Sequence, residues 1–194
     1  MPKVLTSEEG SMLVSLARES IITSFHSKEL TIPEKHKKIF FFPTGVFVTL
    51  RKFGRLRGCL GYARTDQPLY ESLISAARSA AFQDPRYPPL RQSELPKIEL
   101  EISLLTEPTA LNKATPADVL RSITVGKDGI ILSNNNFSGL MLPQVAEKGS
   151  WSTEDFLKYT CTMFGLNEAA WLDPNSRLYK FRANVFTESD CADS

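Results

Sequence analysis

Apolar residues recur along the chain with two periods, one typical of helices and one typical of strands. Helical spacing first appears at Leu13, Leu16, Ala17 and Ile21. Because Thr6 and Glu9 form a capping box before these residues, the pattern predicts an amphipathic helix over residues 7–26. Residues 27–43 are polar, then basic and then apolar, so we expect a loop that lies on the body of the protein.

A second amphipathic helix is predicted after Asp66, a candidate N-cap, and Pro68, which suits the first turn of a helix. Its apolar face consists of Leu69, Leu73, Ala76, Ala77, Ala80 and Ala81. The helix should end before Pro85, because proline disfavours helical geometry at the residue that precedes it. Two shorter helices are predicted over residues 116–121 and 152–164.

Strands are predicted where β-branched and aromatic residues cluster or alternate with polar ones. Residues 45–50 and 56–62 should form a hairpin, and residues 98–104 should form a strand with one buried and one wet face. Further strands are predicted at residues 123–125, 130–132, 137–142 and 179–185, the first two joined by an Asp-Gly turn. Because helices and hairpins mix without a regular β-α-β rhythm, the fold class is α+β, with a mainly antiparallel sheet and flanking helices.

The composition is that of a globular protein, and residues 1–194 are expected to form a single domain. The chain has 194 residues and a net charge of +1, with 42% hydrophobic and 23% charged residues. A charge so close to zero argues against a broadly basic surface for nucleic acid. Three widely spaced cysteines, Cys59, Cys161 and Cys191, predict a reducing, cytoplasmic location, and no apolar run is long enough to cross a membrane.

Several kinds of chemistry are not expected from this sequence. The chain has only two histidines, His26 and His36, and no Cys-x-x-Cys pair, so neither a metal site nor a Cys–His dyad is predicted. It also lacks a phosphate loop and a dinucleotide-binding glycine motif, and no cofactor is expected. The basic run at residues 35–38 is interpreted as a solvated loop.

Two short motifs carry the main candidate functional residues. In the first, Leu56–Gly61, Arg57 and Cys59 should point to one face of a strand while the leucines point into the core. A guanidinium beside a thiol lowers the pKa of the thiol, which would make Cys59 a candidate nucleophile and Arg57 an anion-binding group. Gly58 and Gly61 would let a ligand or a neighbouring strand come close. The alternative is a buried structural cysteine with a surface arginine.

The second motif is Asp84–Leu90, a loop that contains three prolines. Arg86 suits a carboxylate or phosphate that accepts two hydrogen bonds, and Asp84 suits a hydrogen-bond donor or a cap. The alternative is an ion pair between Asp84 and Arg86 that only holds the exit of the preceding helix. Gln144 is a further candidate, because its amide suits a polar ligand; the alternative is an amide that satisfies backbone groups.

The first motif resembles the signature hexamer of the AMMECR domain family, which is named after the AMME chromosomal region, and the second resembles the family's DPRFPPL loop. Further blocks follow in the family's order: Glu94-Leu95, Ile102–Thr106, Gly126–Ile130, Leu142–Ala146, Trp151, Phe156-Leu157 and Cys161. The resemblance covers about residues 10 to 187. The chain departs from it at Lys148 and Ser152, where the family usually has acids, so residues 147–152 are assigned no role.

The resemblance implies an α+β fold with a larger and a smaller lobe, with the signature residues near the cleft between them. Family members often occur beside, or fused to, Memo-type and radical-SAM proteins, which suggests a shared pathway. The first hypothesis is a cleft containing Arg57, Cys59, Asp84 and Arg86 that binds a small anionic or nucleotide-like ligand, with Cys59 as the nucleophile if chemistry follows. The second is a non-enzymatic adaptor that binds a peptide or RNA segment. No membrane partner and no particular oligomeric state is predicted.

Overall fold

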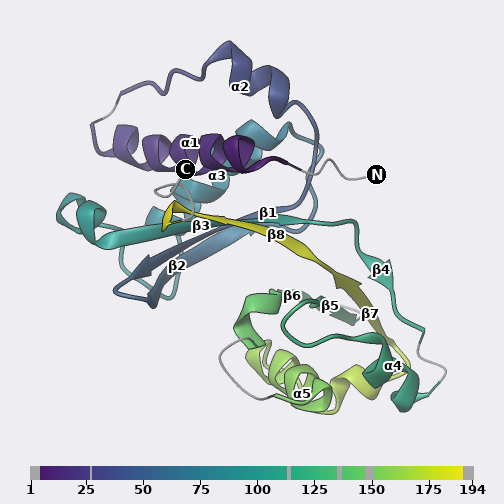
Figure 1. Cartoon of the computed structure of the whole chain (residues 1–194). Helices are drawn as coiled ribbons and strands as arrows, with labels where there is room; N and C mark the ends of the chain where they lie inside the picture. Colours follow the sequence, from purple (N-terminus) through teal and green to yellow (C-terminus); the bar gives the residue numbers. More distant parts are fainter. Residues whose placement is uncertain (1–4, 27, 113–114, 135–136, 147–150, 190–194) are drawn as a thin grey trace. The chain divides into compact units, whose positions relative to one another are not determined.

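The computed structural model describes residues 5–26, 28–112, 115–134, 137–146 and 151–189. The chain divides into two compact units, one formed by residues 1–105 with 184–194 and the other by residues 106–183. Each unit contains a four-stranded sheet together with helices (Figure 1), which confirms the predicted α+β class. No helix in these described ranges is long and apolar enough to cross a membrane.

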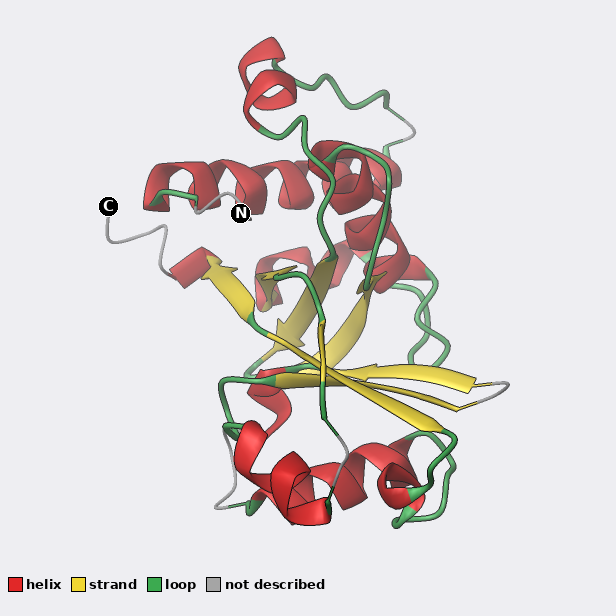
Figure 2. Ribbon diagram, turned by 90° about the vertical axis from the view of Figure 1, so that its right-hand side faces the viewer, coloured by secondary structure: helices red, strands yellow, loops and turns green. Residues whose placement is uncertain are grey.

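The first unit is built on a sheet with the strand order β2-β1-β3-β8. Its strands are β1 (Val46–Lys52), β2 (Arg55–Tyr62), β3 (Ile98–Leu105) and β8 (Ala183–Thr187). Helices α1 (Ser7–Phe25) and α3 (Leu69–Phe82) contact each other and lie on one face of this sheet (Figure 2). Because β2 is an edge strand, the backbone groups on its outer side need partners from outside the sheet.

The core of the first unit lies between the sheet and these two helices. Val46, Val48 and Leu50 alternate along β1 and are completely buried. They face α3, whose buried alanines let the helix approach the sheet closely. Helix α1 begins with the predicted capping box of Thr6 and Glu9. The first helix and the β1–β2 hairpin are therefore confirmed within one or two residues of their predicted ends.

The second unit has the strand order β4-β7-β5-β6. Its strands are β4 (Thr109–Ala110), β5 (Gly129–Asn134), β6 (Phe137–Met141) and β7 (Ser176–Phe181). Its helices are α4 (Pro116–Ser122) and α5 (Thr153–Met163), with short 3-10 turns at η2 (Pro143–Ala146) and η3 (Ala170–Leu172). Ser152 caps α5 in a capping box with Asp155, and this helix lies within one residue of its predicted ends. Residues 147–150 of the departing segment lie outside the described residues.

Three expectations for the first unit are wrong. Residues 27–43 contain a short helix, α2 (Glu34–Ile39), which the completely buried Phe40 anchors at its end. Asp66 is not an N-cap, because α3 begins after Pro68 without a side-chain cap. The face of β3 that was predicted to be exposed to solvent is partly buried, because Ser103 on that face is completely buried. A 3-10 turn, η1 (Gln92–Lys97), precedes that strand.

Two expectations for the remaining strands are corrected. No strand forms at residues 123–125; instead, the buried carboxylate of Asp128 accepts a hydrogen bond from the Thr124 N–H at 2.8 Å and closes a turn. β5 therefore pairs with β6 rather than with that segment. The single predicted strand at 179–185 is two strands, β7 and β8, which belong to different sheets and meet at Arg182.

The close approach of α3 to β2 generates the first prediction. A Cβ atom at Gly58 would lie 2.2 Å from the carbonyl oxygen of Ala80 on α3, which is backbone and cannot rotate away. Gly58→Ala should therefore lower the free energy of unfolding by about 1–3 kcal/mol, measured by urea denaturation. Gly54→Ala is the control, because a Cβ there meets nothing within 4 Å and only its positive φ opposes the change. A Gly58→Ala protein that is as stable as the wild type would contradict this packing.

Candidate functional site

The Leu56–Gly61 motif lies on the edge strand β2 and contains a β-bulge. Gly58 pairs with Leu50 and Leu56 pairs with Arg51, so the ladder skips Arg57. A bulge breaks the simple alternation of side chains between the two faces. Consequently Leu56 is 37% exposed, and the expectation that both leucines of the motif point into the core is wrong for Leu56.

Cys59 lies on a row of three paired residues across the sheet. It pairs with Thr49 on β1, which in turn pairs with Glu101 on β3. The Thr49 hydroxyl donates to Sγ of Cys59 at 3.2 Å. Burial raises the pKa of the Cys59 thiol, and the opposing effects of the Thr49 hydrogen bond and of Arg86 are smaller. The lowered thiol pKa expected from a neighbouring guanidinium is therefore wrong.

The carboxylate of Asp84, at the exit of α3, joins the loop to the edge strand. It is only 4% exposed and accepts four hydrogen bonds. Oδ2 accepts from the Cys59 N–H at 2.8 Å and from Nη2 of Arg86 at 2.7 Å. Oδ1 accepts from the backbone N–H of Arg86 at 3.0 Å and from its Nε at 2.9 Å. Burial alone would raise the pKa of Asp84, but the Arg86 side chain and the two backbone donors together lower it to about 2.

Arg86 completes this contact by binding the carbonyl group of the same residue, Cys59. Its Nη2 donates to the carbonyl oxygen of Cys59 at 3.1 Å, so the outward N–H and C=O of Cys59 are both satisfied by the loop. The predicted ion pair between Asp84 and Arg86 is present at 2.7 Å. This ion pair covers the part of the β2 edge that would otherwise expose unpaired backbone groups.

Arg57 is held by a second carboxylate, that of Glu94 on η1. Nε and Nη2 of Arg57 donate to its two oxygens at 3.2 and 3.0 Å. Lys52 also donates to Glu94, at 2.8 Å, and the N–H of Arg91 donates at 3.1 Å. The Arg57 hydrogen bonds are the largest cause that lowers the pKa of Glu94 to about 2. Both carboxylates of the site are therefore ionised at neutral pH.

Tyr87 brings the two arginines together. The guanidinium carbons of Arg57 and Arg86 lie 5.9 and 5.7 Å from the centre of its ring. Each guanidinium uses its Nε and Nη2 atoms for a carboxylate, and within the described part of the chain Nη1 of neither one has a hydrogen-bond acceptor. We call Arg57, Arg86 and Tyr87 the arginine cluster.

Three other predicted residues are placed differently. The space beside Gly58 is filled by α3, and a Cβ at Gly61 would lie 2.1 Å from the carbonyl oxygen of Val46. Of the two approaches considered for Gly61, the neighbouring strand is therefore the one observed. Gln144 lies on η2 of the other unit. The ligand-binding roles of Gly58, Gly61 and Gln144 stay predictions.

Sequence reasoning did not assign roles to the residues that hold the predicted ones in place. These are Thr49, Lys52, Tyr87 and Glu94. Glu94 and Tyr87 both lie in segments that match the family's blocks, so that match was the available signal. Within the described ranges, no three His, Cys, Asp or Glu side chains are grouped so that they could hold a metal ion.

These features define a class of protein: an α+β chain of two units in which an Asp-Pro-Arg loop clasps a Leu-Arg-Gly-Cys edge strand. The model of the AMMECR1 family matches residues 14–186. The chain therefore belongs to the AMMECR1 family, as the sequence motifs predicted.

Relatives with similar sequences and a similar structure are archaeal. A protein of Methanothermobacter thermautotrophicus is 44% identical over 185 residues, which cover 95% of this chain and 96% of that protein. Protein MK0488 of Methanopyrus kandleri is 39% identical, covering 98% of this chain and 93% of its own. The crystal structure of the uncharacterized protein PH0010 from Pyrococcus horikoshii superposes with a TM-score of 0.89 at 38% identity, covering 95% and 93% of the two chains.

The lowered pKa values predict how acid affects stability. The pKa of Asp84 is lowered from 3.8, and that of Glu94 from 4.5, each to about 2. A carboxyl group with a lowered pKa in the folded state stabilises the fold above its unfolded pKa, and this contribution disappears as the pH falls toward the folded pKa. For Asp84 it amounts to about 2 kcal/mol. Urea unfolding should therefore show a loss of stability between about pH 4.5 and pH 2.

Asp84→Asn should lower stability at pH 7 and flatten this acid-dependent loss, because the amide does not titrate. Asp66→Asn is the matched control, since Asp66 is an exposed aspartate of the same unit. A stability profile of Asp84→Asn that is parallel to that of the wild type would show that the Asp84 carboxylate does not contribute in this way.

The raised pKa of Cys59 predicts slow alkylation. Because the thiolate is the reactive form, iodoacetamide should modify Cys59 more slowly than a free thiol at pH 7, with a rate midpoint above about 8.5. The measurement is peptide mass spectrometry over a pH series, with the buried Cys161 as the internal reference. Rapid labelling of Cys59, with a rate midpoint below that of a free thiol, would contradict this prediction and support Cys59 as an activated nucleophile.

Proposed function

We propose that the protein binds an anionic group of a small or nucleotide-like ligand at the arginine cluster. The observation that carries this proposal is that two guanidinium groups, each fixed by an ionised carboxylate, meet around one tyrosine ring. Carboxylate and phosphate are the anions that a fixed guanidinium binds most strongly.

The fixed position of both arginines supports binding in energetic terms. An arginine side chain that is already ordered loses little conformational entropy when a ligand arrives. Around the cluster, Lys52, Arg57 and Arg86 carry three positive charges against the two negative charges of Asp84 and Glu94, which leaves 3 − 2 = +1. The ring of Tyr87 offers a face on which a planar group of the ligand can stack.

Chemistry at Cys59 is a separate proposal and has weaker support. The thiol is neutral at pH 7 because its pKa is raised, and the thiolate is the nucleophilic form. The main-chain groups of Cys59 are the ones that hold the Asp84–Arg86 loop. Ligand binding at the arginine cluster requires no reaction at the sulfur atom.

An adaptor that binds a partner protein is the second candidate function. The observation that favours it is the turn between β1 and β2, where Phe53 is 79% exposed and Leu56 is exposed beside basic residues. Surface apolar groups of this kind, rimmed by charged residues, are typical of protein interaction sites.

The binding proposal is tested by NMR on the full chain with inorganic phosphate, citrate and ADP as probes. We expect the Nε–Hε signals of Arg57 and Arg86 to shift on titration with at least one of them. Arg57→Lys and Arg86→Lys should each weaken binding by about tenfold, because lysine keeps the charge but loses the fixed two-point geometry. Arg64→Lys is the control, since Arg64 is exposed.

Two results would contradict the proposal. One is that none of the three anions moves the Arg57 and Arg86 signals at millimolar concentration. The other is that Arg64→Lys weakens binding as much as the cluster variants do, which would show that only the overall charge matters. The wild-type titration does not depend on how well any variant folds.

A further inference from the structure

The turn between β1 and β2 has an unusual residue in a strained conformation. Lys52 pairs with Arg55, so Phe53 and Gly54 form a two-residue turn, and both have positive φ, at 51° and 74°. A turn of this type prefers Asn-Gly, because asparagine tolerates the left-handed region and a bulky side chain does not. Among the described residues Phe53 is the one non-glycine position with positive φ.

Packing does not explain why a phenylalanine occupies this position. The Phe53 side chain is 79% exposed, so its ring gains almost nothing from burial in the fold. Backbone strain that neither geometry nor packing repays is typical of positions that serve a function. The structure therefore leaves an aromatic ring presented to solvent at the end of a rigid hairpin.

A shallow pocket of about 420 Å³ lies beside this ring, and we call it the hairpin pocket. It is lined by Lys52, Phe53, Arg55, Leu56 and Arg57. The bulge at Arg57 is what turns Leu56 outward, so the pocket has two apolar side chains among three basic ones. Lys52 and Arg57 share Glu94, whereas Arg55 forms no ion pair with any described residue.

The charge and shape of the pocket favour an acidic peptide over a nucleic acid. Three cations against one carboxylate leave 3 − 1 = +2 at the pocket, which complements acidic side chains. A strand of RNA is typically held by several aromatic residues along a basic groove, whereas here one ring is paired with a leucine. Because the loop occupies the edge of β2 at Cys59, recognition there depends on side chains rather than on an added strand.

We propose that the hairpin pocket docks an acidic peptide segment of a partner protein, with one apolar side chain of that segment packed between Phe53 and Leu56. The flanking Asp or Glu side chains pair with Arg55 and with its basic neighbours. This inference deepens the adaptor role proposed above and does not require ligand binding by Arg86, which does not line the pocket.

The test uses three fluorescein-labelled synthetic peptides of equal length and fluorescence anisotropy with the full chain. One has Leu-Phe flanked by glutamates, one has lysines in place of the glutamates, and one has Gly-Ser in place of Leu-Phe. We expect the first to bind at least about tenfold more tightly than either of the others. Equal binding of all three, or tighter binding of a labelled oligouridylate, would overturn the proposal.

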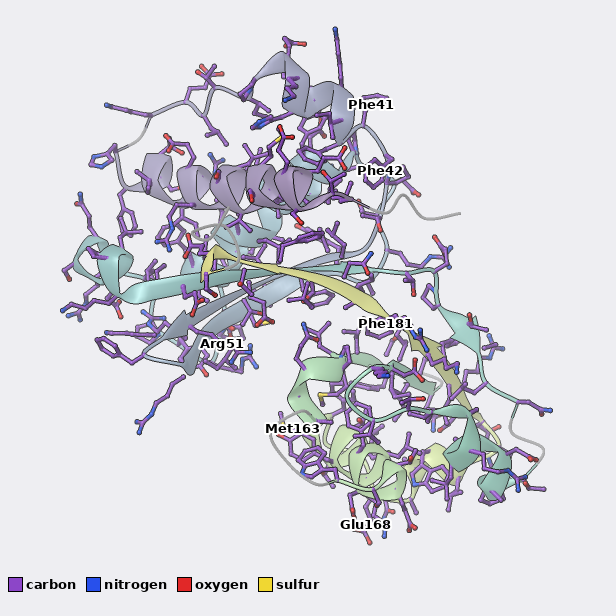
Figure 3. All side chains as sticks on the ribbon, in the orientation of Figure 1. Phe41, Phe42, Arg51, Met163, Glu168 and Phe181 are labelled. Atoms are coloured by element: carbon purple, nitrogen blue, oxygen red, sulfur yellow. The ribbon has the colours of Figure 1, made fainter. Side chains whose placement is uncertain are left out.

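Phe53→Asn removes the aromatic ring and keeps the turn between β1 and β2. Asparagine suits the turn, so the midpoint of urea unfolding should stay the same or rise, while peptide binding should fall by about tenfold. Phe41→Asn is the matched control, because Phe41 is 70% exposed next to α2 (Figure 3) and should leave binding unchanged. A loss of stability in Phe53→Asn, or an equal loss of binding in Phe41→Asn, would contradict the inference.

Charge reversal gives an independent readout. Arg55→Glu should weaken binding of the glutamate peptide and strengthen binding of the lysine peptide, whereas Arg64→Glu should change neither. Phe53→Asn should leave phosphate, citrate and ADP binding unchanged, and Arg86→Lys should leave peptide binding unchanged. The two surfaces are thus tested separately, and a failure of one is distinguishable from a failure of the other.

Discussion

The arrangement of the candidate site depends on the carboxylate of Asp84. This buried group accepts hydrogen bonds from the Cys59 N–H and from three donors of Arg86, while Arg86 in turn reaches the Cys59 carbonyl. One loop therefore satisfies both outward backbone groups of an edge strand, at a point where an uncovered edge would invite pairing with another chain. The same contacts fix Arg86 and position Tyr87 next to it.

The six residues of the edge-strand motif contribute mainly through backbone and packing. Gly58 allows the contact with α3, the bulge at Arg57 turns Leu56 outward, and Cys59 offers its peptide groups rather than a reactive thiolate. Arg57 lies at the junction, since it belongs to the arginine cluster and also lines the hairpin pocket. A single strand thus supports both proposed surfaces, one for an anion and one for a peptide.

Local sequence signals were enough to predict the helices and strands whose ends are set by nearby residues. The capping box at Thr6 marked the start of α1, and the alternation of residues 98–104 marked β3. The segment at 123–125 resembled a strand, but a buried Asp128 holds it in a turn. The division of 179–185 into two strands was also missed, because a continuous alternation gives no sign of which sheet each part joins.

The sequence by itself determined the α+β class and the family, and it singled out Arg57 and Arg86 as candidates and an Asp84–Arg86 ion pair as one alternative, because short-range spacing and local motifs carry that information. Only the tertiary structure decided how those residues act. It left Cys59 half-buried beside Thr49 and so raised the pKa of its thiol, paired Arg57 with Glu94, and filled the space beside Gly58 with α3. Burial and partner choice depend on contacts between segments far apart in the chain, which no local pattern encodes.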